Sequence, residues 1–91
     1  MSPSRVKRRA SASDWKVLEA IQDWYGDHDY APSIREVGEM VGITTQSTHA
    51  HIIWLEKFGY VKRAPFTSRS VTLTKKARRE LEEWRQPKVE A

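Results

Sequence analysis

The apolar positions of residues 32–59 predict two short helices joined by a tight turn. Ser33 is followed three residues later by Glu36, the spacing of a capping box at a helix start. Gly42 supplies the permissive backbone that ends such a helix. Between these points the apolar residues recur at helical spacing, at Ile34, Val37 and Val41.

The second predicted helix covers residues 45–58. Thr44 or Thr45 can cap its start, and Gly59 closes it. Its inward positions are Thr48, Ile52 and Leu55. Two helices with such a turn form a helix-turn-helix unit, whose second helix enters the DNA major groove.

The side of this second helix opposite Ile52 distinguishes a DNA-contacting helix from a merely solvated one. At about 100° per residue, that side carries Gln46, Ser47, Ala50, Trp54 and Lys57. Solvated helices usually carry Glu, Lys and Arg there, whereas the N-terminal half here is small and uncharged. Because a glutamine amide can bond adenine bidentately, the pattern favours base contact.

The preceding segment predicts an acidic first helix. Ser13 is the expected cap, Asp14 suits the positive helix end, and residues 26–29 break the helix before an extended link to Pro32. His28 in this break is expected to be exposed. The apolar stripe is traced by Trp15, Val17, Leu18 and Ile21, with Trp24 or Tyr25 as extensions.

After Gly59 the hydrophobic period changes from helical to alternating. Residues 60–64 and 69–73 are typical of two strands around a basic turn, which together form a β-hairpin wing. Thr74 can then cap a final helix with an apolar edge at Ala77, Leu81 and Trp84. The predicted fold class is α+β, mostly helical: a winged helix-turn-helix of three helices, a two-stranded wing hairpin and an extra C-terminal helix. The expected divisions are a basic arm 1–12, the winged domain 13–73, the helix 74–86 and a tail 87–91.

The 91 residues carry a net charge of +4, and its distribution says more than its sum. The start is purely basic, residues 14–41 hold seven acids against Lys16 and Arg35, and residues 42–73 are basic again with Glu56 as the one acid. This asymmetry favours one nucleic-acid-facing side and double-stranded DNA as partner. With no cysteine, no membrane-length apolar run and no signal peptide, we expect a cytoplasmic, nucleoid-associated protein.

Catalysis has little support in the sequence. His49 and His51 point about 200° apart on a helix and cannot share a metal, and neither a phosphate loop nor a nucleophile motif is present. We therefore expect no enzyme, no metal or other cofactor and no small-molecule effector. The alternative to DNA binding is a winged-helix module that binds an acidic protein partner.

Several of these segments resemble the winged-helix DNA-binding domain of LexA-type repressors. The resemblance is carried by Val17-Leu18-x-x-Ile21, Tyr30-Ala31-Pro32-Ser33-Ile34-Arg35-Glu36-Val37, Val41-Gly42-Ile43 and His51-Ile52-x-x-Leu55-Glu56-Lys57-x-Gly59-Tyr60-Val61-x-Arg63. It implies a transcriptional repressor whose wing arginine is Arg69. Between Gly42 and Leu55 the chain is one residue shorter than the LexA pattern and follows the spacing of winged helices at large, including MarR-like regulators. About 18 residues follow the wing, so no LexA-type self-cleaving protease is expected.

The predicted DNA contacts fall into four groups of residues. Base contacts are expected at Gln46, Ser47, His49 and Ala50, and backbone contacts at Ser33, Thr44, Thr45, Lys57, Lys62 and Arg63. The wing adds Thr67, Ser68 and Arg69, and the arm adds Arg5, Lys7, Arg8 and Arg9. Leu81 and Trp84 have two alternative roles: an interface between two copies of the chain, or completion of the monomer core.

Overall fold

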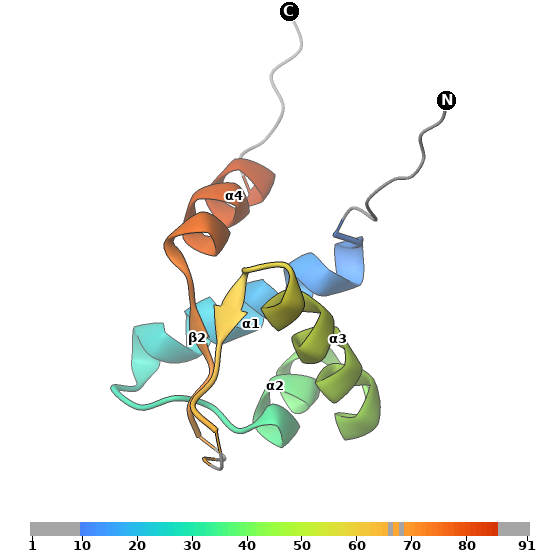
Figure 1. The fold of residues 1–91 in the computed structure, drawn as a ribbon. Helices are drawn as coiled ribbons and strands as arrows, with labels where there is room; N and C mark the ends of the chain where they lie inside the picture. Colours follow the sequence, from blue (N-terminus) through green and yellow to red (C-terminus); the bar gives the residue numbers. More distant parts are fainter. Residues whose placement is uncertain (1–9, 66, 68, 86–91) are drawn as a thin grey trace, which may run out of the picture.

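The computed structural model describes residues 10–65, 67 and 69–85, which form four helices and a two-stranded hairpin. The order is α1 (Ala12–Asp27), α2 (Ile34–Val41), α3 (Thr45–Lys57), β1 (Val61–Lys62), β2 (Thr72–Leu73) and α4 (Lys75–Arg85). In Figure 1, α4 lies at the opposite end of the view from α2, and the hairpin runs between these two ends. The predicted winged helix-turn-helix with an extra C-terminal helix is confirmed.

Helix α1 starts two residues earlier than the polar pattern suggests. Its cap is Ser11, whose side chain accepts the Asp14 N–H (3.2 Å), while the Asp14 carboxylate accepts the Ser11 N–H (2.9 Å). The prediction of Ser13 as the cap was wrong. Asp14 needs to be the third helical residue to complete this reciprocal capping box, and Ser13 lies too close to it in sequence.

The helix-turn-helix follows the prediction closely. Ser33 and Glu36 form the capping box of α2, Gly42 ends that helix with a φ of +90°, and Thr44 caps α3 by accepting the Ser47 N–H. Gly42 is suited to this left-handed position because it has no Cβ. Each helix boundary in this unit is therefore dictated by its own local residues.

Gly38 allows α2 and α3 to approach closely, a role that the sequence analysis missed. A Cβ at this position would lie 2.6 Å from the Thr48 Oγ1 atom and 3.0 Å from the Ile43 carbonyl oxygen. The Thr48 hydroxyl is buried and donates to the Thr44 carbonyl (2.8 Å). An isolated glycine inside a helical pattern was the available signal.

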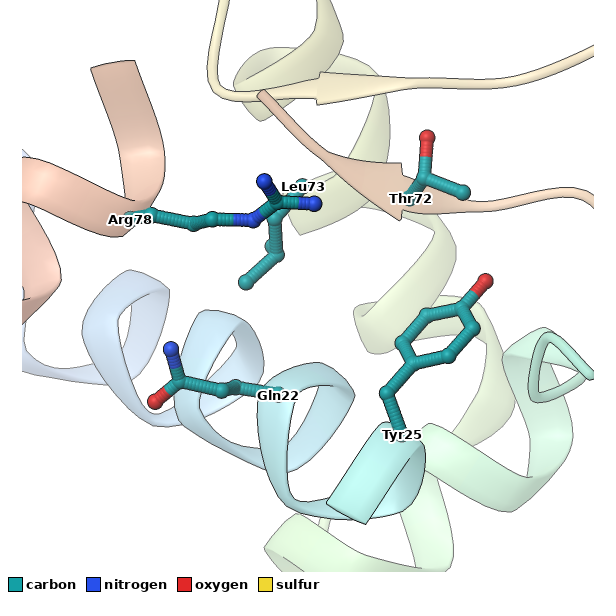
Figure 2. A pocket seen from close by; sticks show the side chains of 5 residues that line it. All are labelled: Gln22, Tyr25, Thr72, Leu73 and Arg78. Atoms are coloured by element: carbon teal, nitrogen blue, oxygen red, sulfur yellow. The ribbon is translucent and has the colours of Figure 1, made fainter. Parts of the chain in front are cut away.

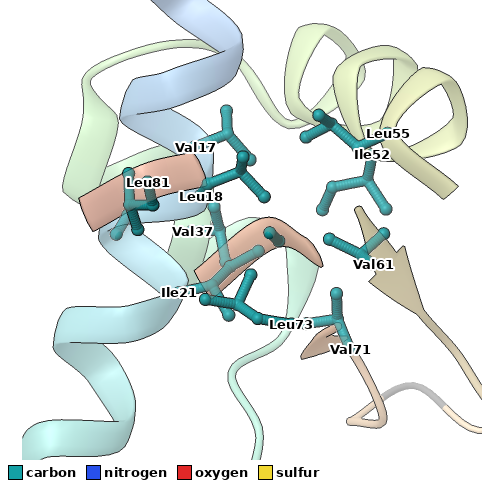
Figure 3. Close-up of a cluster of buried hydrophobic side chains, with 12 residues drawn as sticks. Val17, Leu18, Ile21, Val37, Ile52, Leu55, Val61, Val71, Leu73 and Leu81 are labelled. Atoms are coloured by element: carbon teal, nitrogen blue, oxygen red, sulfur yellow. The ribbon is translucent and has the colours of Figure 1, made fainter. Parts of the chain in front are cut away.

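One apolar core joins every element (Figure 3). Helix α1 runs along one side of it, α3 and the hairpin lie on the opposite side, and α4 contributes Ala77 and Leu81. The buried members of the core are Val17, Leu18, Ala20, Ile21, Val37, Ile52, Leu55, Val61, Val71, Leu73, Ala77 and Leu81. In the described part of the hairpin the strands are shorter than the alternation predicts: Val61 pairs with Leu73, and Lys62 with Thr72.

Candidate nucleic-acid interface

The exposed residues of α3 form an outer face that a ligand can reach. We define this face as Gln46, His49, Ala50, Ile53 and Lys57, all of which are exposed. The face is uncharged except for Lys57 at its C-terminal end. Its N-terminal half offers an amide, an imidazole and a small methyl side chain, which permits close approach to another surface.

The observed outer face is rotated from the predicted one. Trp54, predicted to point outward, is half-buried, stacks on Tyr60 with ring centroids 6.3 Å apart and lies 4.5 Å from the Phe58 ring. Ser47 is half-buried beside the Thr44 cap, whereas Ile53 is 45% exposed. The prediction took Ile52 as the centre of the buried side. Thr48 and Leu55 are buried as well, so the centre lies between these three residues, and the opposite side includes Ile53 in place of Trp54.

A hydrogen bond to a buried carboxyl group joins α3 to the start of α1. Asp14 is fully buried, and its Oδ1 atom lies 2.6 Å from the His51 Nδ1 atom. Its Oδ2 atom accepts the Ser11 N–H (2.9 Å) and hydroxyl (3.0 Å). The carboxylate oxygen accepts this hydrogen bond from the His51 ring nitrogen. This contact fixes the middle of α3 against the capped end of α1.

Arg69, predicted as the wing's duplex contact, is bound to the protein itself. Its Nη2 atom donates to Glu36 Oε2 (2.9 Å), and its Nη1 atom lies 2.8 Å from Glu36 Oε1 and 3.1 Å from the Ala31 carbonyl oxygen. The guanidinium also lies 5.4 Å from the Tyr30 ring centroid and 6.0 Å from that of Trp24. We call this set of contacts the wing clamp.

The wing clamp has a clear electrostatic signature. The hydrogen bond from Arg69, followed by the Ser33 backbone N–H, lowers the pKa of Glu36 to about 2. The same pairing raises the pKa of Arg69. Since Glu36 also completes the α2 capping box, one carboxylate joins the wing to the first helix of the helix-turn-helix.

The other described residues predicted to contact the DNA backbone, from the helices or from the wing, are either exposed or bonded within the protein. Lys62, Thr67 and Thr45 are exposed, whereas Arg63 donates to Glu56 Oε1 from its Nη2 (2.8 Å) and Nε (3.2 Å) atoms. The hydroxyls of Ser33 and Thr44 accept cap hydrogen bonds, from the N–H groups of Glu36 and Ser47. The arm residues Arg5, Lys7, Arg8 and Arg9, and Ser68 of the wing, lie outside the described residues.

His28 was predicted to be exposed, but it is half-buried in a cluster of rings beside the wing clamp. Its ring stacks on Trp24 with a centroid separation of 3.8 Å, and its Nδ1 atom lies 3.0 Å from the Trp24 carbonyl oxygen. The Trp24 indole N–H in turn donates to the Tyr30 carbonyl (2.7 Å). The loop between α1 and α2 is thereby held in the shape that meets Arg69.

Helix α4 lies against α1, away from the outer face of α3. Leu81 is fully buried in the single chain, which supports its role in the monomer core. Trp84 stacks on Trp15 with centroids 6.0 Å apart and remains 40% exposed. Arg85 bonds both Glu19 (2.9 Å) and Asp23 (3.0 Å), so acids of α1 are paired on this side.

A shallow hollow of about 150 Å³ lies between α1, β2 and α4. Figure 2 shows its lining: Thr72 lies above the Tyr25 ring, and the Arg78 side chain ends beside Leu73, across from Gln22. It belongs to the scaffold that supports the wing. Among the described residues, no group of three or more His, Cys, Asp or Glu could hold a metal ion, and no helix is long and apolar enough to cross a membrane.

The protein-family model of the LexA DNA binding domain matches residues 8–70 of this chain. The chain belongs to the LexA DNA-binding domain family. The predicted resemblance is therefore confirmed, and the matched residues include the helix-turn-helix and most of the wing.

Similar LexA-family proteins are longer than this chain. The LexA repressor of Thermosipho melanesiensis is 36% identical over 69 residues, which are 76% of this chain and 35% of that protein. The LexA repressor of Brevibacillus brevis is 38% identical over 66 residues, 71% of this chain and 32% of that protein. The chain thus spans about a third of the length of these relatives.

A solved structure confirms the fold. The transcriptional regulator Tm0710 from Thermotoga maritima superposes with a TM-score of 0.60 at 20% identity, over 80% of this chain and 49% of that one. At this identity, the similarity concerns the fold of the LexA-family domain and not its ligand.

Proposed function

We propose that this chain binds double-stranded DNA with sequence preference and acts as a transcriptional repressor. Membership of the LexA DNA-binding domain family supports the class of function. The observation that carries the proposal is the outer face of α3, an exposed helical surface without a carboxylate that continues into an exposed lysine. Such a surface meets the edges of base pairs without repelling the flanking phosphates.

In this proposal the N-terminal half of α3 lies in the major groove. Gln46 offers a bidentate donor and acceptor to adenine, while His49 and Ala50 lie within the same row and Ser47 at its edge. Lys57, Lys62 and Thr45 are exposed and approach the sugar-phosphate backbone. The basic arm adds charge-dependent affinity along the phosphates or in the minor groove.

Selection of bound sequences from random duplexes, followed by affinity measurements on the selected site, tests this function. Gln46→Ala should cost roughly 1–3 kcal/mol on the preferred site and relax one base position. Lys57→Ala is the contrasting variant and should weaken binding to all sequences alike. Uniform loss with Gln46→Ala would show that Gln46 does not contact a base.

The same assay separates DNA binding from the alternative function as a protein-binding module. A gel shift on the selected duplex, with excess non-specific duplex present, should retain the complex. A protein-binding winged helix would lose every shifted band under that competition.

We further propose that two copies pair through the exposed end of α4, because two domains on a palindrome multiply specificity over competing genomic sites. With Leu81 in the core, the available apolar group is Trp84, which is 40% exposed on the Trp15 ring. Sedimentation should give a dimeric parent and a folded, monomeric Trp84→Ala variant. A parent that stays monomeric at high concentration would contradict this pairing.

A further inference from the structure

Ile53 is exposed on the outer face of α3, and the fold does not explain it. Its neighbour Ile52 is fully buried in the core, whereas Ile53 is 45% exposed. A β-branched side chain is a weaker helix former than Lys, Glu or Ala at a solvated position. An exposed isoleucine here gains little from burial and loses helix propensity, so a ligand is the natural source of its apolar contact.

The position of Ile53 places it in the same row as the proposed base contacts. It follows Ala50 by three residues and Gln46 by seven, the spacing of one helical face. Seven residues correspond to about 10 Å along a helix axis. Successive base pairs are about 3.4 Å apart, so on a helix lying along the groove this offset corresponds to roughly three base pairs between Gln46 and Ile53.

The major groove offers an apolar partner for such a side chain. Among the base edges exposed there, the thymine C5-methyl group is the apolar feature, and the other groups are hydrogen-bond donors and acceptors. We propose that Ile53 is a specificity-determining residue that packs against a thymine methyl group. This inference rests on the proposed function and adds a base preference that no hydrogen-bonding residue of the outer face would supply.

Replacement of thymine by deoxyuridine tests this contact directly, because it removes the methyl group and leaves base pairing intact. After selection of the preferred site with the full chain, each thymine of the site is replaced in turn, and the dissociation constant is measured by fluorescence anisotropy. One or two thymines should show a three- to fivefold loss, about the effect of removing one methyl group from an apolar contact. In Ile53→Ala the same replacements should leave the affinity unchanged.

Met40→Ala is the matched control. Met40 is 46% exposed, nearly the same fraction as Ile53, but lies on α2. This variant should keep the full deoxyuridine penalty. Both substitutions remove an exposed side chain from a helix, so both variants are expected to fold.

The outcomes separate this inference from the proposed function. A parent that binds its site equally well with every thymine replaced, or an Ile53→Ala variant that keeps the penalty, overturns the methyl contact and leaves DNA binding standing. An Ile53→Ala variant altered only in self-association assigns the side chain to a second copy and overturns it as well. A chain that enriches no duplex overturns both.

Discussion

The outer face of α3 and the wing were both predicted to contact DNA, but they differ in how their side chains are bonded within the protein. The side chains of the outer face project from a helix whose inner side is buried, and Gln46, Ala50 and Ile53 are exposed. In the wing, Arg69 and Arg63 bond the carboxylates of Glu36 and Glu56. The α3 side chains are therefore exposed to solvent, whereas the two wing arginines are bonded to carboxylates of neighbouring helices.

This difference shows that a positive charge in a predicted wing does not by itself identify a phosphate contact. The planar guanidinium group can form bidentate hydrogen bonds to a carboxylate as well as to a phosphate. Here α2 supplies the carboxylate. We therefore expect α3 variants to change which sequence is bound, and wing-clamp variants to change how firmly the wing is held.

Gly38→Ala should produce the largest effect, because it acts on the position of α3 itself. The new methyl group would lie 2.6 Å from the Thr48 Oγ1 atom, and separating two packed helices costs about 1–3 kcal/mol of unfolding free energy. Urea denaturation measures this loss. Gly26→Ala is the control, since a Cβ there meets nothing within 4 Å. Equal stability of the parent and the Gly38→Ala variant would show that the interhelical contact is loose.

His51→Leu should lower stability by about 0.5–1.5 kcal/mol, the net contribution of one hydrogen bond. The buried Asp14 carboxylate would keep its Ser11 partners but lose the imidazole 2.6 Å away. Thermal unfolding measures the effect, and His49→Leu on the exposed face should stay within about 0.5 kcal/mol of the parent. Similar losses in both variants would contradict a specific role for the Asp14 contact.

Arg69→Ala should remove a pH-dependent part of the stability. The pKa of Glu36 falls from 4.5 to about 2 in the folded protein. A depressed carboxyl pKa stabilises the fold above its unfolded value, and this contribution is lost as the pH falls from about 4.5 through 2. The difference in melting temperature between parent and variant should therefore be full near neutral pH and shrink over that window.

Arg35→Ala is the control for this titration. Arg35 pairs with Glu39 at 3.4 Å, and both side chains are largely exposed, so little stability is expected from the pair. A pH-independent gap for Arg69→Ala would indicate that the wing is held by the aromatic contacts and not by Glu36.

The smallest predicted effects are on the salt dependence of DNA binding. Lys62→Ala should reduce the slope of log affinity against log salt by about one, the value for one phosphate contact. Deleting residues 1–10 removes Arg5, Lys7, Arg8 and Arg9, keeps the Ser11 cap and should reduce the slope further. Arg69→Ala should leave the slope nearly unchanged. A full-unit change for Arg69→Ala would place its guanidinium on DNA and not in the wing clamp.

The local pattern was sufficient to predict most of the fold. Capping boxes, glycine stops and the change from helical to alternating periodicity act over three or four residues. For this reason the ends of α2, the start of α3 and the existence of the hairpin and α4 follow from the sequence. The family resemblance rested on the same segments and was confirmed over residues 8–70.

Tertiary contacts decided the details that matter for the candidate site. A helical wheel gives relative angles but not the direction of the core, so the inward turn of Trp54 and the exposure of Ile53 depended on how α3 packs. Likewise, the partner of Arg69 lies 33 residues away on another helix, and that of Asp14 lies 37 residues away. The sequence determined which residues could form helices, caps and ion pairs. Packing of α3 and the wing against α1 and α2 determined which of them remain exposed to a ligand, because only the folded chain brings residues distant in sequence within bonding distance.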